Sequence, residues 1–165
     1  MHPLYRVVSD VRFAAGAAFA REAERLGASV ARIRGDVTDF WFHDLAVQWK
    51  ERPLAVAGLT AHGPLFCLER WGWDHGLRVV YRGSHRTQGR GIEHVISGPG
   101  ATVGRARRLS WDAAQWAPGV ARIVTACPID SGLPETLTIA RAADRQPDEP
   151  DEPLVSWVIA ARHRA

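Results

Sequence analysis

The chain has 165 residues, of which 46% are hydrophobic and 24% charged, and its formal net charge is +3. This length and balance fit a single globular domain over 1–165, and no apolar run approaches the ~20 residues of a membrane-spanning helix. The basic residues are nearly all arginines spread along the chain, and acidic residues almost balance them, so nucleic-acid binding is disfavoured. The two cysteines, Cys67 and Cys127, form neither a metal-ligand spacing nor a disulfide framework, and we expect buried free thiols.

The first half of the chain alternates between strand-like and helix-like patterns. Short apolar runs alternate with segments of helical periodicity, and glycine or proline marks most of the boundaries. The predicted strands are 5–8, 28–33, 54–57 and 77–81, and the predicted helices are 11–26, 38–52 and 64–75. Such alternation predicts a parallel sheet with right-handed crossovers.

The alternation ends near residue 79. Segments 79–84 and 92–97 predict a β-hairpin that adds an antiparallel strand. Further on we expect a helix over 110–116, strands over 121–126, 136–140 and 154–160, and an exposed acidic, proline-rich loop over 144–153. The predicted fold class is α/β, with three layers of the Rossmann-like or flavodoxin-like type. Its sheet is expected to be mostly parallel with an antiparallel hairpin extension.

In open α/β sheets, ligands bind outside the carboxyl ends of the strands, where the strand order reverses. The common strand order places the first and third strands side by side, so that Ser9 and Asp10 would face the segment 58–63. Free N–H groups of the helix expected after this segment favour a carboxylate, a phosphate or an oxyanion.

Glycines bound the segment 58–63, and Gly58 and Gly63 would let its backbone approach a ligand. Thr60 could donate a hydroxyl hydrogen bond, and His62 could act as acid or base near neutral pH. The alternative is an ordinary strand-to-helix turn in which Thr60 caps the helix. The segment has neither a Walker motif nor a Gly-x-Gly-x-x-Gly fingerprint, so nucleotide binding is not favoured.

Two further candidates have structural alternatives. Cys67 lies about one turn into the predicted helix, where a thiol could become a nucleophile, but its apolar neighbours favour a place in the core. Asp36 follows the second predicted strand and could reach a ligand hydroxyl, although helix capping explains it more simply.

A histidine pair is expected on the hairpin. If Gly89 and Arg90 form a two-residue turn, cross-strand partners have numbers that sum to 179, so His85 faces His94. Facing imidazoles could share a divalent metal, with His62 or Asp10 as a third ligand, or one ring could polarise the other. The alternative is two half-exposed polar residues on a sheet face.

The chain also resembles an uncharacterised bacterial family whose members often carry a twin-arginine export signal. The resemblance rests on Gly35-Asp36-Val37-Thr38, Ala57-Gly58-Leu59-Thr60, Gly63-Pro64-Leu65-Phe66-Cys67, Asp74-His75-Gly76 and Ser156-Trp157-Val158-Ile159-Ala160. It implies a periplasmic location. The first residues lack the basic and apolar parts of a signal peptide, so the expected location is cytoplasmic or, after removal of a signal, periplasmic.

Two functional hypotheses follow. In the first, the protein is an enzyme acting on a small anionic or carbonyl-bearing molecule, with His62 as the proton-transfer residue and Asp10 orienting a histidine or the substrate. In the second, it is a non-catalytic accessory protein that binds a ligand, a metal or a partner enzyme at the same edge. A homo-oligomer is compatible with both.

Overall fold

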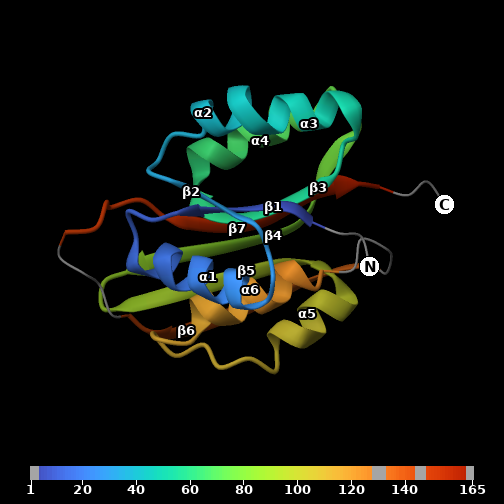
Figure 1. Ribbon diagram of the computed structural model, residues 1–165. Coiled ribbons are helices and arrows are strands. Elements are labelled where there is room, and N and C mark those ends of the chain that lie inside the picture. Colours follow the sequence, from blue (N-terminus) through green and yellow to red (C-terminus); the bar gives the residue numbers. More distant parts are fainter. Residues whose placement is uncertain (1–3, 128–132, 144–147, 163–165) are drawn as a thin grey trace.

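The computed structural model describes residues 4–127, 133–143 and 148–162. Within them the chain forms one sheet of seven strands with helices on both faces (Figure 1). The strands are β1 (Leu4–Asp10), β2 (Val30–Ile33), β3 (Ala55–Ala61), β4 (Leu77–Gln88), β5 (Gly91–Pro99), β6 (Pro134–Ala142) and β7 (Leu154–Ala161). The helices are α1 (Ala14–Arg25), α2 (Thr38–Phe40), the π-helix η1 (Trp41–Leu45), α3 (Ala46–Glu51), α4 (His62–Trp73), α5 (Gly100–Ala106) and α6 (Trp116–Thr125).

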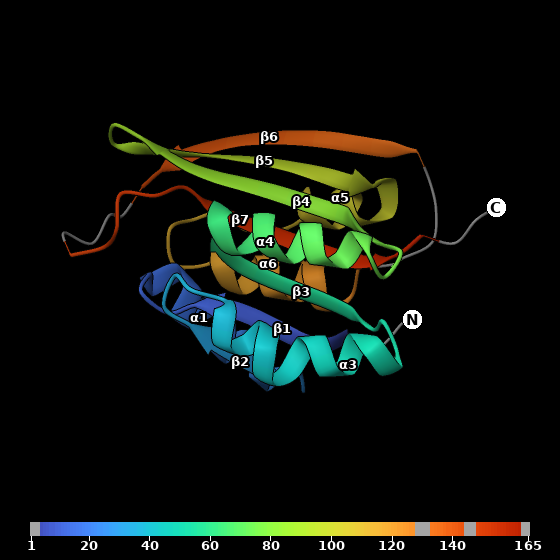
Figure 2. The same ribbon diagram turned by 90° about the horizontal axis from the view of Figure 1, so that it is seen from above.

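The sheet is mixed, with the strand order β2-β1-β3-β7-β4-β5-β6 (Figure 2). Strand β1 pairs in parallel with β2 and β3, whereas the pairings from β3 through β6 are antiparallel. The α/β class and the adjacency of the first and third strands are therefore confirmed. The expectation of a mostly parallel sheet holds only at the β2-β1-β3 end, because β7 inserts between β3 and β4 and pairs with both.

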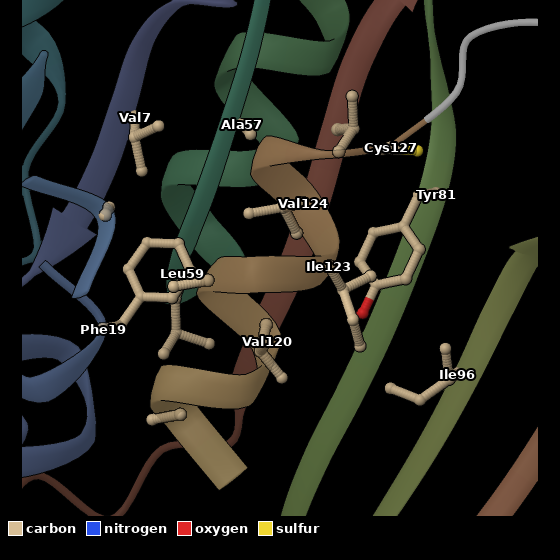
Figure 3. Close-up of a cluster of buried hydrophobic side chains, with 14 of the residues drawn as sticks. Val7, Phe19, Ala57, Leu59, Tyr81, Ile96, Val120, Ile123, Val124 and Cys127 are labelled. Atoms are coloured by element: carbon tan, nitrogen blue, oxygen red, sulfur yellow. The ribbon is translucent and has the colours of Figure 1, made fainter. Parts of the chain in front are cut away.

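Two helical layers cover the sheet, each over its own hydrophobic core. Helices α2, α3 and α4 lie on one face, and α1, α5 and α6 lie on the other (Figure 1). The core under α3 and α4 includes Trp49, Leu65 and Trp157. Figure 3 shows the core under α1 and α6, where Tyr81 of β4 lies beside Ile123 of α6. A side chain thus belongs to one layer or the other, which decides which candidate residues can meet.

The predicted turn over 58–63 is wrong. Strand β3 continues through Ala61, all seven of its residues are buried, and α4 begins directly at His62. The predicted strand 54–57 is interior, as expected, but its partners β1 and β7 extend the pairing to Leu59 and to Ala61 respectively. The backbone of residues 58–61 therefore forms its hydrogen bonds within the sheet, and it is not free to approach a ligand as a loop would be.

Other predictions after residue 99 have mixed outcomes. The expected strand over 121–126 is part of helix α6, and the expected helix over 110–116 is absent, since α6 begins only at Trp116. The β-branched residues of this segment favour a strand, but packing between α1 and the sheet overrides that local preference. Strands over 136–140 and 154–160 are confirmed as β6 and β7. Of the expected loop, 144–147 lies outside the described residues, and 148–153 has neither helix nor strand.

The described helices include none that is both long enough and apolar enough to span a bilayer.

Gly58 is a packing residue, and its substitution tests this. A Cβ atom there would lie 2.5 Å from the Trp157 ring and 2.6 Å from the carbonyl oxygen of Val8. We expect Gly58→Ala to lower the free energy of unfolding by about 1–3 kcal/mol, because the buried ring must shift. Gly63→Ala is the matched control, since a Cβ there meets nothing within 4 Å. Urea unfolding of both variants measures the difference, and equal stabilities would contradict the assignment.

Candidate functional site

The β4–β5 hairpin brings two histidines face to face. Its register pairs Gln88 with Gly91 and His85 with His94, as the sum rule predicted. Gly89 supplies the positive φ of +59° that a tight hairpin turn requires. The expected pairing is therefore confirmed. The alternative of half-exposed side chains is wrong, because His85 is 2% exposed and His94 is fully buried.

The two imidazoles belong to a chain of four hydrogen-bonded side chains on three strands. The Nδ1 atoms of His85 and His94 are 2.8 Å apart, and His85 Nε2 is 2.8 Å from Ser156 Oγ. Ser156 Oγ is in turn 3.1 Å from the hydroxyl of Tyr81. All four residues are buried. We call Tyr81, Ser156, His85 and His94 the polar relay.

The direction of the polar relay follows from its donors and acceptors. If Tyr81 donates to Ser156, Ser156 donates to His85 Nε2, and His85 Nδ1–H donates to His94 Nδ1, then every O–H has an acceptor. The opposite direction leaves the buried Tyr81 O–H without an acceptor among the described residues, which costs free energy. In the favoured direction the relay ends at His94 Nε2–H, and that atom is buried without a hydrogen-bond partner among the described residues.

Burial keeps both imidazoles neutral, and aromatic rings cover them. Trp116 stacks on His85 with ring centroids 4.6 Å apart, and Trp111 lies 4.7 Å from His94. Burial, with a smaller contribution from His94, holds the pKa of His85 well below its usual value. Burial and the nearby Arg141 charge lower the pKa of His94 to about 4. Both rings are therefore uncharged near pH 7.

A cavity of about 600 Å³ opens beside the polar relay. Its walls come from the first turns of α1 and α6, the β4–β5 hairpin and the segment 149–154, and both His85 and Trp116 line it. Phe13 and Ala14 follow the end of β1, and His85 lies near the end of β4. The cavity therefore lies at the carboxyl ends of these strands, the edge of the sheet at which we expected a site.

Five charged side chains line the cavity: the carboxylates of Glu149, Asp151 and Glu152 and the guanidinium groups of Arg21 and Arg86. Glu149 accepts the backbone N–H of Ala14 at 2.6 Å, Glu152 lies 3.6 Å from Arg12, and Asp151 also has a partner, so all three carboxylates are engaged with the protein. Arg21 and Arg86 also line the cavity, and neither forms an ion pair with any other residue that the structure describes. The two guanidinium groups are the charges with which a ligand could pair.

Ser9 and Asp10 lie at the expected edge of the sheet, but both are buried and form hydrogen bonds within the protein. Ser9 donates its hydroxyl hydrogen to the carbonyl of Gly16 at 2.6 Å. The carboxylate of Asp10 accepts from the Arg12 guanidinium at 2.7 Å and from the Arg12 backbone N–H. Neither lines the cavity, and both hold the connection between β1 and α1.

The residues predicted around α4 do not join the cavity. Thr60 accepts from the Trp157 indole N–H at 3.1 Å and donates to the carbonyl of Ala61, so its hydroxyl is engaged within the core. His62 is exposed at the start of α4, and Cys67 is half-buried against the core of that same layer. Helix α4 covers the opposite face of the sheet from α1 and α6 (Figure 1). The expected convergence of His62 with the histidine pair is therefore wrong.

Asp36 accepts the backbone N–H of Thr38, the first residue of α2, at 2.8 Å, whereas Val37 is the N-cap residue of that helix. The metal hypothesis lacks a third ligand, because no group of three histidine, cysteine or acidic side chains suited to a metal occurs in the described part of the chain. Of the third ligands suggested, His62 lies in the other layer and Asp10 is bound to Arg12.

Ser156, His85 and His94 have the order of a nucleophile, a base and an orienting group. Ser156, however, is completely buried on the central strand β7, and it does not line the cavity. A substrate that occupies the cavity meets His85 and not the serine. The geometry therefore does not present the Ser156 hydroxyl as a nucleophile to a molecule in the cavity.

Sequence reasoning did not single out Tyr81, Ser156, Trp116, Arg21 or Arg86. Local patterns cannot show that β7 lies beside β4, and this pairing sets Ser156 next to His85. The small residues at the starts of α1 and α6 were the available signal for a hollow, because alanines leave space between a helix and a sheet edge. Those lining the cavity are Ala14, Ala15, Ala18, Ala113, Ala114 and Ala117.

Comparison with known proteins gives no match: no protein-family model, curated protein or solved structure is significantly similar to the chain. The resemblance to a twin-arginine-exported family stays a prediction.

Two substitutions test the direction of the polar relay. Tyr81→Phe removes the first donor and leaves the remaining O–H and N–H donors of the relay as they were, so we expect a loss of about 1 kcal/mol in unfolding free energy. Ser156→Ala strands both the Tyr81 hydroxyl and His85 Nε2, so we expect a larger loss of about 2–4 kcal/mol. Urea unfolding compares them. A loss for Tyr81→Phe equal to that for Ser156→Ala would contradict this order of donors.

The lowered histidine pKa values predict acid sensitivity. Below the usual pKa of 6.5 the unfolded chain takes up protons at His85 and His94, but the folded protein does not until about pH 4 for His94. Stability is therefore full above pH 6.5, and it should fall by about 1.4 kcal/mol per pH unit for each histidine as the pH drops toward 4.5. Urea unfolding from pH 7 to 4.5 measures this.

The double variant His85→Phe/His94→Phe is the control, and its stability should change less over the same range. NMR titration of the wild-type protein gives an independent measurement. Ring signals of His85 and His94 that titrate with an ordinary pKa near 6.5 would contradict the assignment.

Proposed function

We propose that the protein binds a small organic anion in the cavity beside the polar relay. The observation that carries this proposal is a hollow of about 600 Å³ against a buried, neutral histidine pair. Its volume is within the range of small-molecule sites, roughly 300–1,000 Å³. Its position at the carboxyl ends of β1 and β4 is the end of the sheet at which open α/β proteins hold their ligands.

The lining suggests the chemistry of the ligand. Phe13, Ile92 and Trp116 offer apolar and aromatic surface to a planar or hydrophobic portion. Arg21 and Arg86 offer guanidinium groups suited to a carboxylate or a phosphate. These features favour a molecule with a ring or short apolar body and one anionic group.

The polar relay supports a role for His85 in acid–base chemistry. A ligand proton could pass to His85 Nε2 if this atom exchanged its bond to Ser156 for one to the ligand. His94 would stabilise the resulting imidazolium by accepting the His85 Nδ1–H, as an orienting group does. In this form of the proposal, His85 takes the place that the sequence assigned to His62.

The alternative is a non-catalytic binding protein, and one observation favours it. Both ring nitrogens of His85 already have hydrogen-bond partners inside the protein, at 2.8 Å each. A histidine held in this way can shape and polarise a site without exchanging protons. A periplasmic location, implied by the resemblance, would suit either form.

Ligand binding can be tested with simple aromatic anions such as benzoate, phenylacetate and phenyl phosphate. A member of the panel that fits should raise the melting temperature, because a ligand at ~100 times its dissociation constant adds about 2.7 kcal/mol of stability. Calorimetric titration then gives the dissociation constant. We expect Arg21→Ala and Arg86→Ala each to raise it by about tenfold, through loss of a charge-assisted hydrogen bond.

Two controls locate the site. Ala18→Phe should fill the cavity and abolish binding, whereas Arg52→Ala, which removes an exposed charge after α3, should leave binding unchanged. The absence of a shift with every anion of the panel, or equal binding by the Ala18→Phe variant, would overturn the proposal.

A further inference from the structure

Strand β6 is the long, open edge of the sheet. It is last in the strand order, and its nine residues pair only with β5 among the described residues (Figure 2). The opposite edge strand, β2, has only four residues. A long unpaired edge exposes backbone N–H and C=O groups to any chain that can align with it, and proteins usually shorten, cover or pair such edges.

The sequence of β6 is complementary to itself. If two copies pair antiparallel about Thr138, opposing residues have numbers that sum to 276. Glu135 then faces Arg141 of the second copy, Leu137 faces Ile139, and Thr138 faces its own equivalent. Thr138 is the middle residue of β6, so this register pairs the strand over its full length, from Pro134 to Ala142.

The side chains also lie on matching faces. Leu137 and Ile139 pack partly against the core under α5 and α6, and they are the half-buried residues of an otherwise exposed strand. Successive residues alternate between faces, so Glu135 and Arg141 share this face at the two ends of the strand. An antiparallel partner places equivalent faces on the same side. Each copy would therefore cover the apolar pair of the other and exchange two opposite-charge pairs.

Other registers lose this complementarity. Moving the two-fold axis by one residue, to Leu137 or Ile139, leaves at least one of the two charges opposite an apolar residue. Among the residues that the structure describes, Glu135 has one ion-pair partner, Arg107, at 3.7 Å, and both side chains of that pair are more than half exposed. Its carboxylate is thus accessible to a second cation.

We infer that two copies of this chain join through β6, paired antiparallel about Thr138, to form a continuous sheet across the dimer. The interface is isologous, as in most homodimers, since the same strand serves both copies. None of the nine residues of β6 lines the cavity, so failure of the dimer would leave the proposed function intact.

Sedimentation velocity over a concentration series tests the inference. We expect a species of twice the 18.2 kDa chain mass. Glu135→Arg or Arg141→Glu alone replaces two attractive pairs by two repulsive ones, and each should raise the dimer dissociation constant at least tenfold. The double variant Glu135→Arg/Arg141→Glu exchanges the charges and should restore the dimer, which also shows that the substitutions leave the fold intact. Arg52→Glu is the control for net charge and should have no effect.

Cross-linking tests the register. Thr138→Cys should give an interchain disulfide on mild oxidation, because each cysteine faces its equivalent, whereas Thr136→Cys would face Ala140 and should not. The wild-type chain, with Cys67 and Cys127, measures the background. A monomer at all concentrations, or a dimer that neither charge reversal weakens, would overturn the inference. A dimer cross-linked by Thr136→Cys in preference to Thr138→Cys would overturn the register.

Discussion

The insertion of β7 between β3 and β4 is the constraint on which both faces of the molecule depend. Residues 154–160 are all buried, and the strand contributes a hydrogen-bonding side chain to each of the two layers. On one face, Trp157 packs against Gly58 and donates its indole N–H to Thr60. On the other, Ser156 joins Tyr81 to His85. Because neighbouring residues of a strand point to opposite faces, one dipeptide organises both layers.

The polar relay shows how four hydrogen-bonding side chains can be buried at small cost. An unpaired buried polar group costs about 1–3 kcal/mol, so the arrangement is stable only if nearly every donor finds an acceptor. The direction from Tyr81 to His94 satisfies this except at His94 Nε2. The same burial that demands this pairing lowers the histidine pKa values. A neutral, oriented imidazole next to a cavity is therefore a consequence of the packing as much as of any later function.

Local sequence signals predicted those features that depend on residues close together in the sequence. The turn at Gly89 and Arg90 fixes the hairpin register, so the facing of His85 and His94 could be derived from numbering alone. The position of β7 could not be derived from the sequence. This strand comes from the end of the chain but lies at the centre of the sheet, and no local pattern near Ser156 indicates which strands lie beside it. The glycines at both ends of the segment 58–63 predict a turn there. In the structure Gly58 makes room for Trp157, a residue 99 positions later in the chain.

The location of the candidate site likewise has one part that the sequence could predict and one part that it could not. The expectation that a site lies at the carboxyl ends of the strands concerns the sheet as a whole, and the cavity does lie there. Which face of the sheet carries the cavity could not be predicted in this way, because it depends on where the helices leave space. Helix α4 begins directly at the end of β3, and the strand beneath it is fully buried. Helix α1 instead starts four residues after β1, and it and α6 present alanines to the edge. The hollow therefore forms under α1 and α6, and the histidines that meet it are those of the hairpin.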